Sequence, residues 1–123
     1  MPCSYEFDSA RRLMILRASG KLTPEELVDT RARGAADPRF DRTWSSLADF
    51  RAVTAFERRP RVILEMARNP IVARNTRIAI LPPEGEQWGM ARLFVACAQL
   101  LGRPVEVFHD LEKAERWLGV WTG

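Results

Sequence analysis

The chain has 123 residues, of which 46% are hydrophobic and 28% charged, as is usual for one globular domain. No apolar run approaches the ~20 residues that cross a bilayer, so the sequence predicts no transmembrane segment. The formal net charge of +3 is small and gives no sign of a strongly basic, nucleic-acid-binding composition.

The first predicted element is an antiparallel hairpin. Residues 4–8 (SYEFD) alternate around Tyr5 and Phe7, and a second β-rich run, residues 11–19 (RRLMILRAS), follows after a short polar break. Two such runs so close together favour direct pairing, and Gly20 is expected to end the second strand.

The next residues form an unusually complete helix start. Thr23 is the predicted cap, Pro24 suits the first turn, and Glu26 can reach back to the cap. The helix is expected to stop near residues 37–38, because the residue before a proline resists the helical conformation. Its core-facing stripe is predicted to be Val28, Ala32 and Ala35.

Two strands and a helix follow in the middle of the chain. Residues 44–50 (WSSLADF) form the predicted third strand, with Leu47 and the ring of Trp44 available to the core. Residues 60–68 (PRVILEMAR) form the second helix. Residues 76–81 (TRIAIL) are β-branched and almost continuously apolar, which indicates a strand buried on both faces.

The last third of the chain repeats the alternation. A long helix is predicted over 84–101 and should end at Gly102. Residues 104–108 (PVEVF) form the next strand, and Asp110 is well placed to cap a closing helix over 110–118. The apolar stripe of the long helix is predicted to be Met90, Phe94, Cys97 and Leu101.

The order of elements is therefore ββαβαβαβα. After the opening hairpin every strand is followed by a helix, which requires parallel pairing through right-handed crossovers. We expect an α/β fold in which residues 1–123 form a single domain with a mixed sheet and packed helices.

This order and its landmarks resemble the STAS superfamily, and more closely its SpoIIAA-like branch of small bacterial proteins. The landmarks are Y-x-F near the start, then GKLTPEEL, ADPRF, LADFRAVT, RIAILP, WGMARLF and VEVFHDLEKAERWL. They cover nearly the whole chain, although each is mainly a marker of fold. The resemblance implies a four- or five-stranded mixed sheet backed by helices, in a branch whose members largely lack an assigned function.

The resemblance also implies a regulatory site. STAS regulators of the anti-sigma-factor-antagonist type carry a phosphorylatable serine just after an aspartate at the end of the central strand. Asp49 matches that aspartate, but Phe50 and Arg51 occupy the hydroxyl positions. The nearest hydroxyl, on Thr54, is displaced and is expected to cap the next turn, with Glu57 completing a capping box. The implied protein is a STAS-like module without the usual phosphorylation switch.

Two interpretations of Asp49 remain open. In the first, its carboxylate bonds to nearby amides or to an arginine, while Phe50 packs beneath the helices. In the second, the carboxyl ends of the parallel strands form a binding site. A small anionic or partly apolar ligand would then lie between Arg51, Trp88 and His109. Alternatively Trp88 covers the sheet edge and His109 is a solvated turn residue.

No arrangement of residues indicates an enzyme, a cofactor or a metal site. The chain has one histidine, and Cys3 and Cys97 lie 94 positions apart, which gives no metal-ligand spacing. No glycine-rich nucleotide loop or G-x-S-x-G motif occurs. His109 could orient a base only beside a nucleophile, and Ser45, Ser46 and Cys97 lie in predicted strand or core.

Partner surfaces are indicated in two places. Segment 57–77 carries six arginines against two glutamates, a local +4 that could attract an acidic partner. Arginine outnumbers lysine 17 to 2 overall, however, and no aromatics alternate with these arginines, so nucleic acid is disfavoured. Trp117 is expected to pack on the sheet, and Trp121 in a groove or a subunit contact, which would suit a homodimer.

The sequence thus favours a non-catalytic, STAS-like regulatory or protein-interaction module that binds a protein partner or itself. Residues 1–12 contain no apolar signal core, so a cytoplasmic location is expected. The alternative is a small-molecule or lipid-binding module with its site at the carboxyl ends of the parallel strands. That alternative requires a concave apolar pocket beside Trp88 and Met90.

Overall fold

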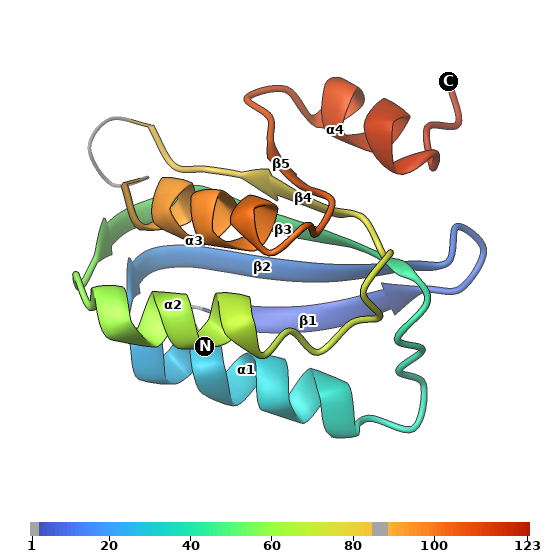
Figure 1. Cartoon of the computed structure of the whole chain (residues 1–123). Helices are drawn as coiled ribbons and strands as arrows, with labels where there is room; N and C mark the ends of the chain where they lie inside the picture. The colour runs from blue at the N-terminus through green and yellow to red at the C-terminus, as the bar shows by residue number, and fades with distance from the viewer. Residues whose placement is uncertain (1–2, 85–88) are drawn as a thin grey trace.

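The computed structural model describes residues 3–84 and 89–123, and these form a five-stranded mixed sheet with four helices (Figure 1). The strands are β1 (Cys3–Asp8), β2 (Leu13–Leu22), β3 (Ser45–Phe56), β4 (Ile78–Leu81) and β5 (Val105–Val107). The helices are α1 (Pro24–Ala36), α2 (Pro60–Arg68), α3 (Gly89–Leu100) and α4 (Leu111–Leu118). The predicted α/β class and the order ββαβαβαβα are confirmed.

The order of strands in the sheet is the order of strands in the chain, β1-β2-β3-β4-β5. β1 and β2 pair antiparallel, and all later neighbours pair parallel, as predicted. None of the helices in the described ranges is long and apolar enough to cross a membrane.

Helices cover both faces of the sheet, unequally. Helices α1, α2 and α3 lie on one face, here called the three-helix face, and α4 lies on the other, the α4 face (Figure 1). β4 shows the result most clearly, because Ala79 and Leu81 pack with α4 while Ile80 packs with α3. All three are at most 4% exposed, which confirms a strand buried on both faces.

Helix α1 begins at the predicted residue, but the side it turns toward the sheet differs from the predicted one. The Thr23 hydroxyl accepts the Glu26 amide at 3.2 Å, and the Glu26 carboxylate accepts the Thr23 amide at 3.3 Å, so the capping box is formed. The predicted stripe was wrong, since Val28 is 42% exposed. The buried stripe consists of Pro24, Leu27, Thr30 and Gly34. Polar Thr30 can be buried because its hydroxyl donates to the Glu26 carbonyl at 2.8 Å.

Strand β3 does not end near Asp49 but continues to Phe56, which corrects the sequence prediction. Its register with β2 passes from Arg17 opposite Asp49 to Ser19 opposite Ala52, so β3 contains one residue more over this interval. A second register shift follows, since Gly20 lies opposite Val53 and Lys21 opposite Ala55. Such bulges bend a strand and redirect its side chains. They explain why a pattern based on strict alternation loses the strand here.

The bulged strand also changes the role predicted for Thr54. Thr54 is an exposed residue within β3, and it caps no helix. Helix α2 begins instead at Pro60, preceded by Arg59, whose side chain makes no capping hydrogen bond. The expected capping box with Glu57 is therefore wrong.

The long third helix was predicted to begin at Glu84, which is not helical, and residues 85–88 lie outside the described residues. Its buried residues are Met90, Val95 and Ala98, whereas Leu101 is 41% exposed and lies beyond the helix end. The predicted stripe is therefore right in part. Met90 is buried and Phe94 packs against the core, but Val95 and Ala98, which meet β4 and β5, were not predicted, and Cys97 is only partly buried.

Three smaller predictions near the end of the chain are confirmed. Gly102 follows α3 with φ of +77°, a conformation that favours glycine. The Asp110 carboxylate accepts the amides of Glu112 at 2.8 Å and Lys113 at 3.4 Å and so caps α4. Trp117 packs against the buried cluster on the α4 face.

Candidate functional site: an apolar pocket beneath the three helices

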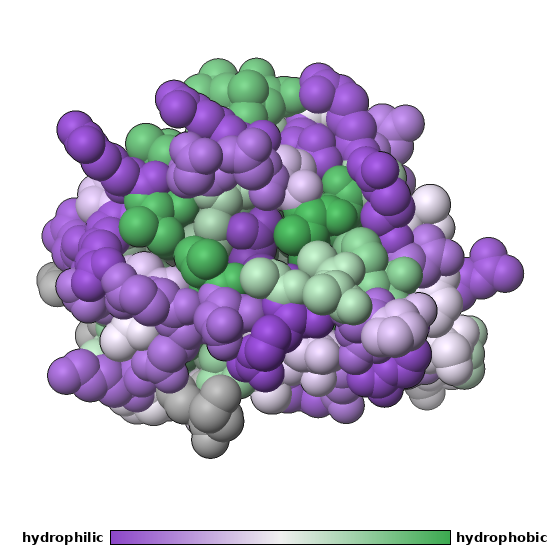
Figure 2. Space-filling view, turned by 90° about the horizontal axis from the view of Figure 1, so that it is seen from below, coloured by the Kyte–Doolittle hydropathy of each residue, from purple (hydrophilic) through white to green (hydrophobic). Residues whose placement is uncertain are grey.

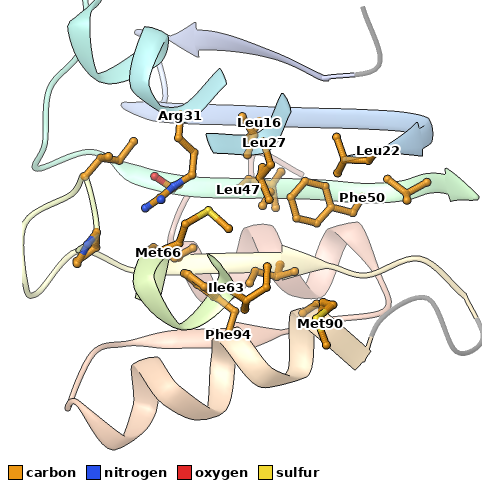
Figure 3. Close-up of a pocket in the computed structure, with 18 of the residues that line it drawn as sticks. Leu16, Leu22, Leu27, Arg31, Leu47, Phe50, Ile63, Met66, Met90 and Phe94 are labelled. Atoms are coloured by element: carbon orange, nitrogen blue, oxygen red, sulfur yellow. The ribbon is translucent and has the colours of Figure 1, made fainter. Parts of the chain in front are cut away.

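A cavity of about 130 Å³ lies between the three-helix face of the sheet and helices α1, α2 and α3 (Figure 3). Figure 2, which views the molecule from below Figure 1, shows patches of apolar surface among polar side chains. Apolar residues of both layers line the cavity, including Leu16, Leu22, Leu27, Ala48, Phe50, Val53, Phe56, Ile63, Met66, Met90 and Phe94.

The pocket has a simple origin in the sequence of β3. Ala48 pairs with Leu16 of β2 on one side and Ile80 of β4 on the other, so one small side chain stands in a row of large ones. Helix α2 lies over this part of the sheet and buries only Ile63, Met66 and Ala67 from its nine residues. Space therefore remains above Ala48.

The bulges of β3 place the far wall of the pocket. Ala48 and Phe50 face the helices, and after the first bulge Val53 does so in place of Ala52. The strand then reaches Phe56, which is paired with Leu22 at the carboxyl ends of β3 and β2. One end of the pocket thus lies at the carboxyl ends of the strands.

The lining is adaptable as well as apolar. Met14, Met66 and Met90 all line the pocket, and together they are three of the four methionines of the chain. Methionine is unbranched and polarisable, so it fills irregular space and repacks around different occupants. A wall rich in methionine can close on itself or admit a ligand.

Arg31 is the only charged residue among the described residues that line this pocket. It is partly buried, and Figure 3 shows its side chain reaching from α1 toward Met66. Burial lowers the pKa of Arg31 below its usual value, because the charged form loses water contact. The side chain of Arg31 makes no hydrogen bond or ion pair with the other residues in ranges 3–84 and 89–123.

Sequence patterns missed Arg31, although a signal was present. It lies four residues after Leu27 and three before Gly34, on the stripe that α1 turns toward the sheet. The spacing Pro24, Leu27, Arg31, Gly34 places an arginine on a core-facing stripe. The incorrect stripe through Val28 concealed it.

The predicted site residues lie elsewhere. Arg51 donates to Asp49 through Nε at 2.9 Å and through Nη2 at 2.8 Å, and its amide donates at 3.2 Å. Phe50 packs beneath the helices. These contacts agree with the first of the two interpretations of Asp49, in which its carboxylate bonds to an arginine and Phe50 packs beneath the helices. The hydrogen bonds from Arg51 lower the pKa of the Asp49 carboxyl, although desolvation opposes them.

Asp49 and Arg51 line a shallow, open depression together with Ser4, Arg17 and Ser19. Arg17 forms an ion pair with Glu6, so the charges around the depression are largely matched. His109 is exposed in the turn between β5 and α4, and Trp88 lies outside the described residues. Neither Asp49, Arg51 nor His109 lines the apolar pocket.

The Asp49–Arg51 pair gives a prediction for stability against pH. Asp49→Asn should lower the free energy of unfolding by about 0.5 kcal/mol at pH 7, because one partner is 47% exposed and solvent screens the pair. A carboxyl whose pKa is lowered by folding stabilises above its unfolded pKa, about 3.9, and loses that effect as the pH falls through the folded pKa. Urea unfolding at several pH values should show the two proteins converging below about pH 4. An undiminished difference in acid would contradict this role.

The described residues contain no group of three or more histidine, cysteine, aspartate or glutamate side chains that could hold a metal ion. Comparison of the sequence with protein-family models and with curated proteins finds no match.

Proposed function

We propose that this protein is a non-catalytic binding module that holds a small, largely apolar molecule between its sheet and helices α1–α3. The carrying observation is the pocket of about 130 Å³, whose described lining is apolar except for Arg31 and Ser46. Ligand sites are typically concave and mostly apolar, with few polar groups that fix orientation. The cavity begins at the carboxyl ends of the strands and continues beneath α2. It therefore extends farther than the site expected from the sequence, which lay at the carboxyl ends alone.

The methionines supply the test of this proposal. Protein labelled with ¹³C at the methionine methyl groups would be titrated with 3-phenyl-1-propanol, a neutral compound with a compact ring. We expect saturable shifts of the Met14, Met66 and Met90 signals, because all three side chains line the pocket. Unchanged signals from all three at saturating compound would overturn the proposal.

Native mass spectrometry of gently purified protein complements the titration. A reproducible additional mass would support a bound small molecule and begin to identify it.

The two cysteines are free thiols in the structure, which supports a reducing, cytoplasmic location as part of this proposal.

A second candidate is a STAS-like protein-interaction module that binds a partner or itself. The resemblance in element order supports it, and so does an exposed apolar pair at the end of α3, where Leu100 is 89% and Leu101 41% exposed. Adjacent exposed leucines are common at contact surfaces. Sedimentation equilibrium would test self-association, and a monomer at every concentration would remove a homodimer from this candidate.

A further inference from the structure

We propose that the pocket selects an amphipathic carboxylic acid, whose carboxylate pairs with Arg31 while its compact apolar body lies beneath α2. This inference rests on the proposed function and adds the chemical class of the ligand. It is carried by the place of one arginine in an otherwise apolar wall.

The partial burial of Arg31 in an apolar wall is unfavourable in free energy. A charged group that leaves water without a partner is destabilising, so partly buried arginines are usually paired. Arg33, two residues further on α1, donates to Asp29 at 2.9 Å, and Arg11 pairs with Asp8 at 2.7 Å. Arg31 lines the pocket and makes no comparable contact within the described ranges. An anion in the pocket would supply the negatively charged partner that the described part of the chain does not provide for Arg31.

A carboxylate is the anion that matches the guanidinium of Arg31. A guanidinium offers parallel N–H donors that match the two oxygens of a carboxylate, and such paired hydrogen bonds are short and strong. Arginine remains protonated at neutral pH even where burial lowers its pKa. The interaction is strengthened by the apolar surroundings, since fewer water molecules compete for either partner.

The volume of the cavity limits the size of the ligand. The cavity holds about 130 Å³, close to an engineered apolar cavity of about 150 Å³ that binds benzene. The apolar body is therefore a ring or a short branched chain. A long acyl chain would require α2 to move away from the sheet. Figure 3 shows Phe94 and Met90 on α3, across the pocket from Arg31, where such a body would lie.

The test compares two compounds that differ only at one end. Isothermal titration calorimetry would measure 3-phenylpropionate and 3-phenyl-1-propanol on the unaltered protein. We expect the acid to bind about tenfold more tightly, the usual effect of hydrogen bonds to a charged group. Arg31→Met should remove this preference and leave the affinity for the alcohol within about twofold, since the methionine side chain keeps the apolar wall.

Arg33→Met is the matched control. It removes the same charge from the same helix, but Arg33 is exposed and paired with Asp29, so the preference for the acid should persist. If Arg31→Met does not fold, the ratio of the two affinities, acid to alcohol, on the unaltered protein decides whether the pocket prefers a carboxylate. Arg31→Lys, which keeps the charge without the planar fork, then provides the second variant.

Each outcome separates the inference from the proposed function. Equal affinity for acid and alcohol would overturn the inference while leaving an apolar pocket that binds ligands. Binding of neither compound would overturn both. Tighter binding of 3-phenylpropyl phosphate than of the acid would replace the carboxylate with a phosphate monoester. A preference for the acid that survives Arg31→Met would remove Arg31 as its cause.

Discussion

Leu81→Ala should lower the free energy of unfolding by about 3 kcal/mol, because deletion of a fully buried leucine side chain loses apolar burial and leaves a cavity. Leu81 is 0% exposed at the end of β4 and packs in the cluster beneath α4 with Leu13, Leu47 and Leu118. Small domains have only about 5–15 kcal/mol of net stability, so this loss would be large. Urea unfolding followed by circular dichroism would measure it.

Leu100→Ala is the control for that prediction. It deletes the same atoms, but Leu100 is 89% exposed on α3, so the free energy of unfolding should change by less than about 0.5 kcal/mol. Comparable losses in the two variants would mean that α4 does not cover β4 as described. The comparison thus tests the α4 face of the sheet directly.

Ala48→Leu should weaken binding of 3-phenyl-1-propanol by at least about tenfold, because the added carbon atoms occupy the space left above β3. Stability should stay the same or rise by up to about 1 kcal/mol, as is usual when a cavity is filled. The methionine signals of the labelled protein report binding, and urea unfolding reports stability. The two measurements together distinguish a filled pocket from a damaged fold.

Ala52→Leu is the matched substitution on the same strand. Ala52 is exposed and lines the shallow depression rather than the apolar pocket, so binding should be unchanged. If Ala48→Leu bound the alcohol as well as the unaltered protein does, the pocket would not be the binding site. A loss of about 1–3 kcal/mol in Ala48→Leu would show instead that the space is already filled.

The sequence predicted several ends of elements where one residue has a specific backbone role, but not the end of β2, which continues past Gly20 to Leu22. Thr23, Pro60, Gly102 and Asp110 all act at the predicted positions. The faces of helices were predicted less well. In α1 the small residues after Val28 suggested a core stripe, but the helix turns Leu27 and the hydrogen-bonded Thr30 inward. Apolarity alone does not determine which stripe is buried when a polar side chain can bond to its own helix.

The candidate site depended on features that local patterns do not contain. The bulges of β3 are defined by pairing with β2, a strand some thirty residues earlier, so sequence alternation ended the predicted strand at Phe50. Asp49 and Arg51 are charged residues at a predicted strand end, and their side chains pair with each other. The proposed role of Arg31 depends on α2 and β3, because residues of both elements line the same pocket. Such a pocket belongs to tertiary structure rather than to a motif.

The agreement between strand order and chain order has a consequence for synthesis on the ribosome. Each strand can join the growing sheet as it emerges, beside the strand made just before it, without waiting for a distant segment. The α4 face is the exception, because Leu13 and Leu47 are covered by a helix that is made last, over residues 111–118. A nascent chain that has already completed its five strands therefore still presents a bare apolar surface. Nascent-chain chaperones that bind such surfaces should dissociate when α4 docks.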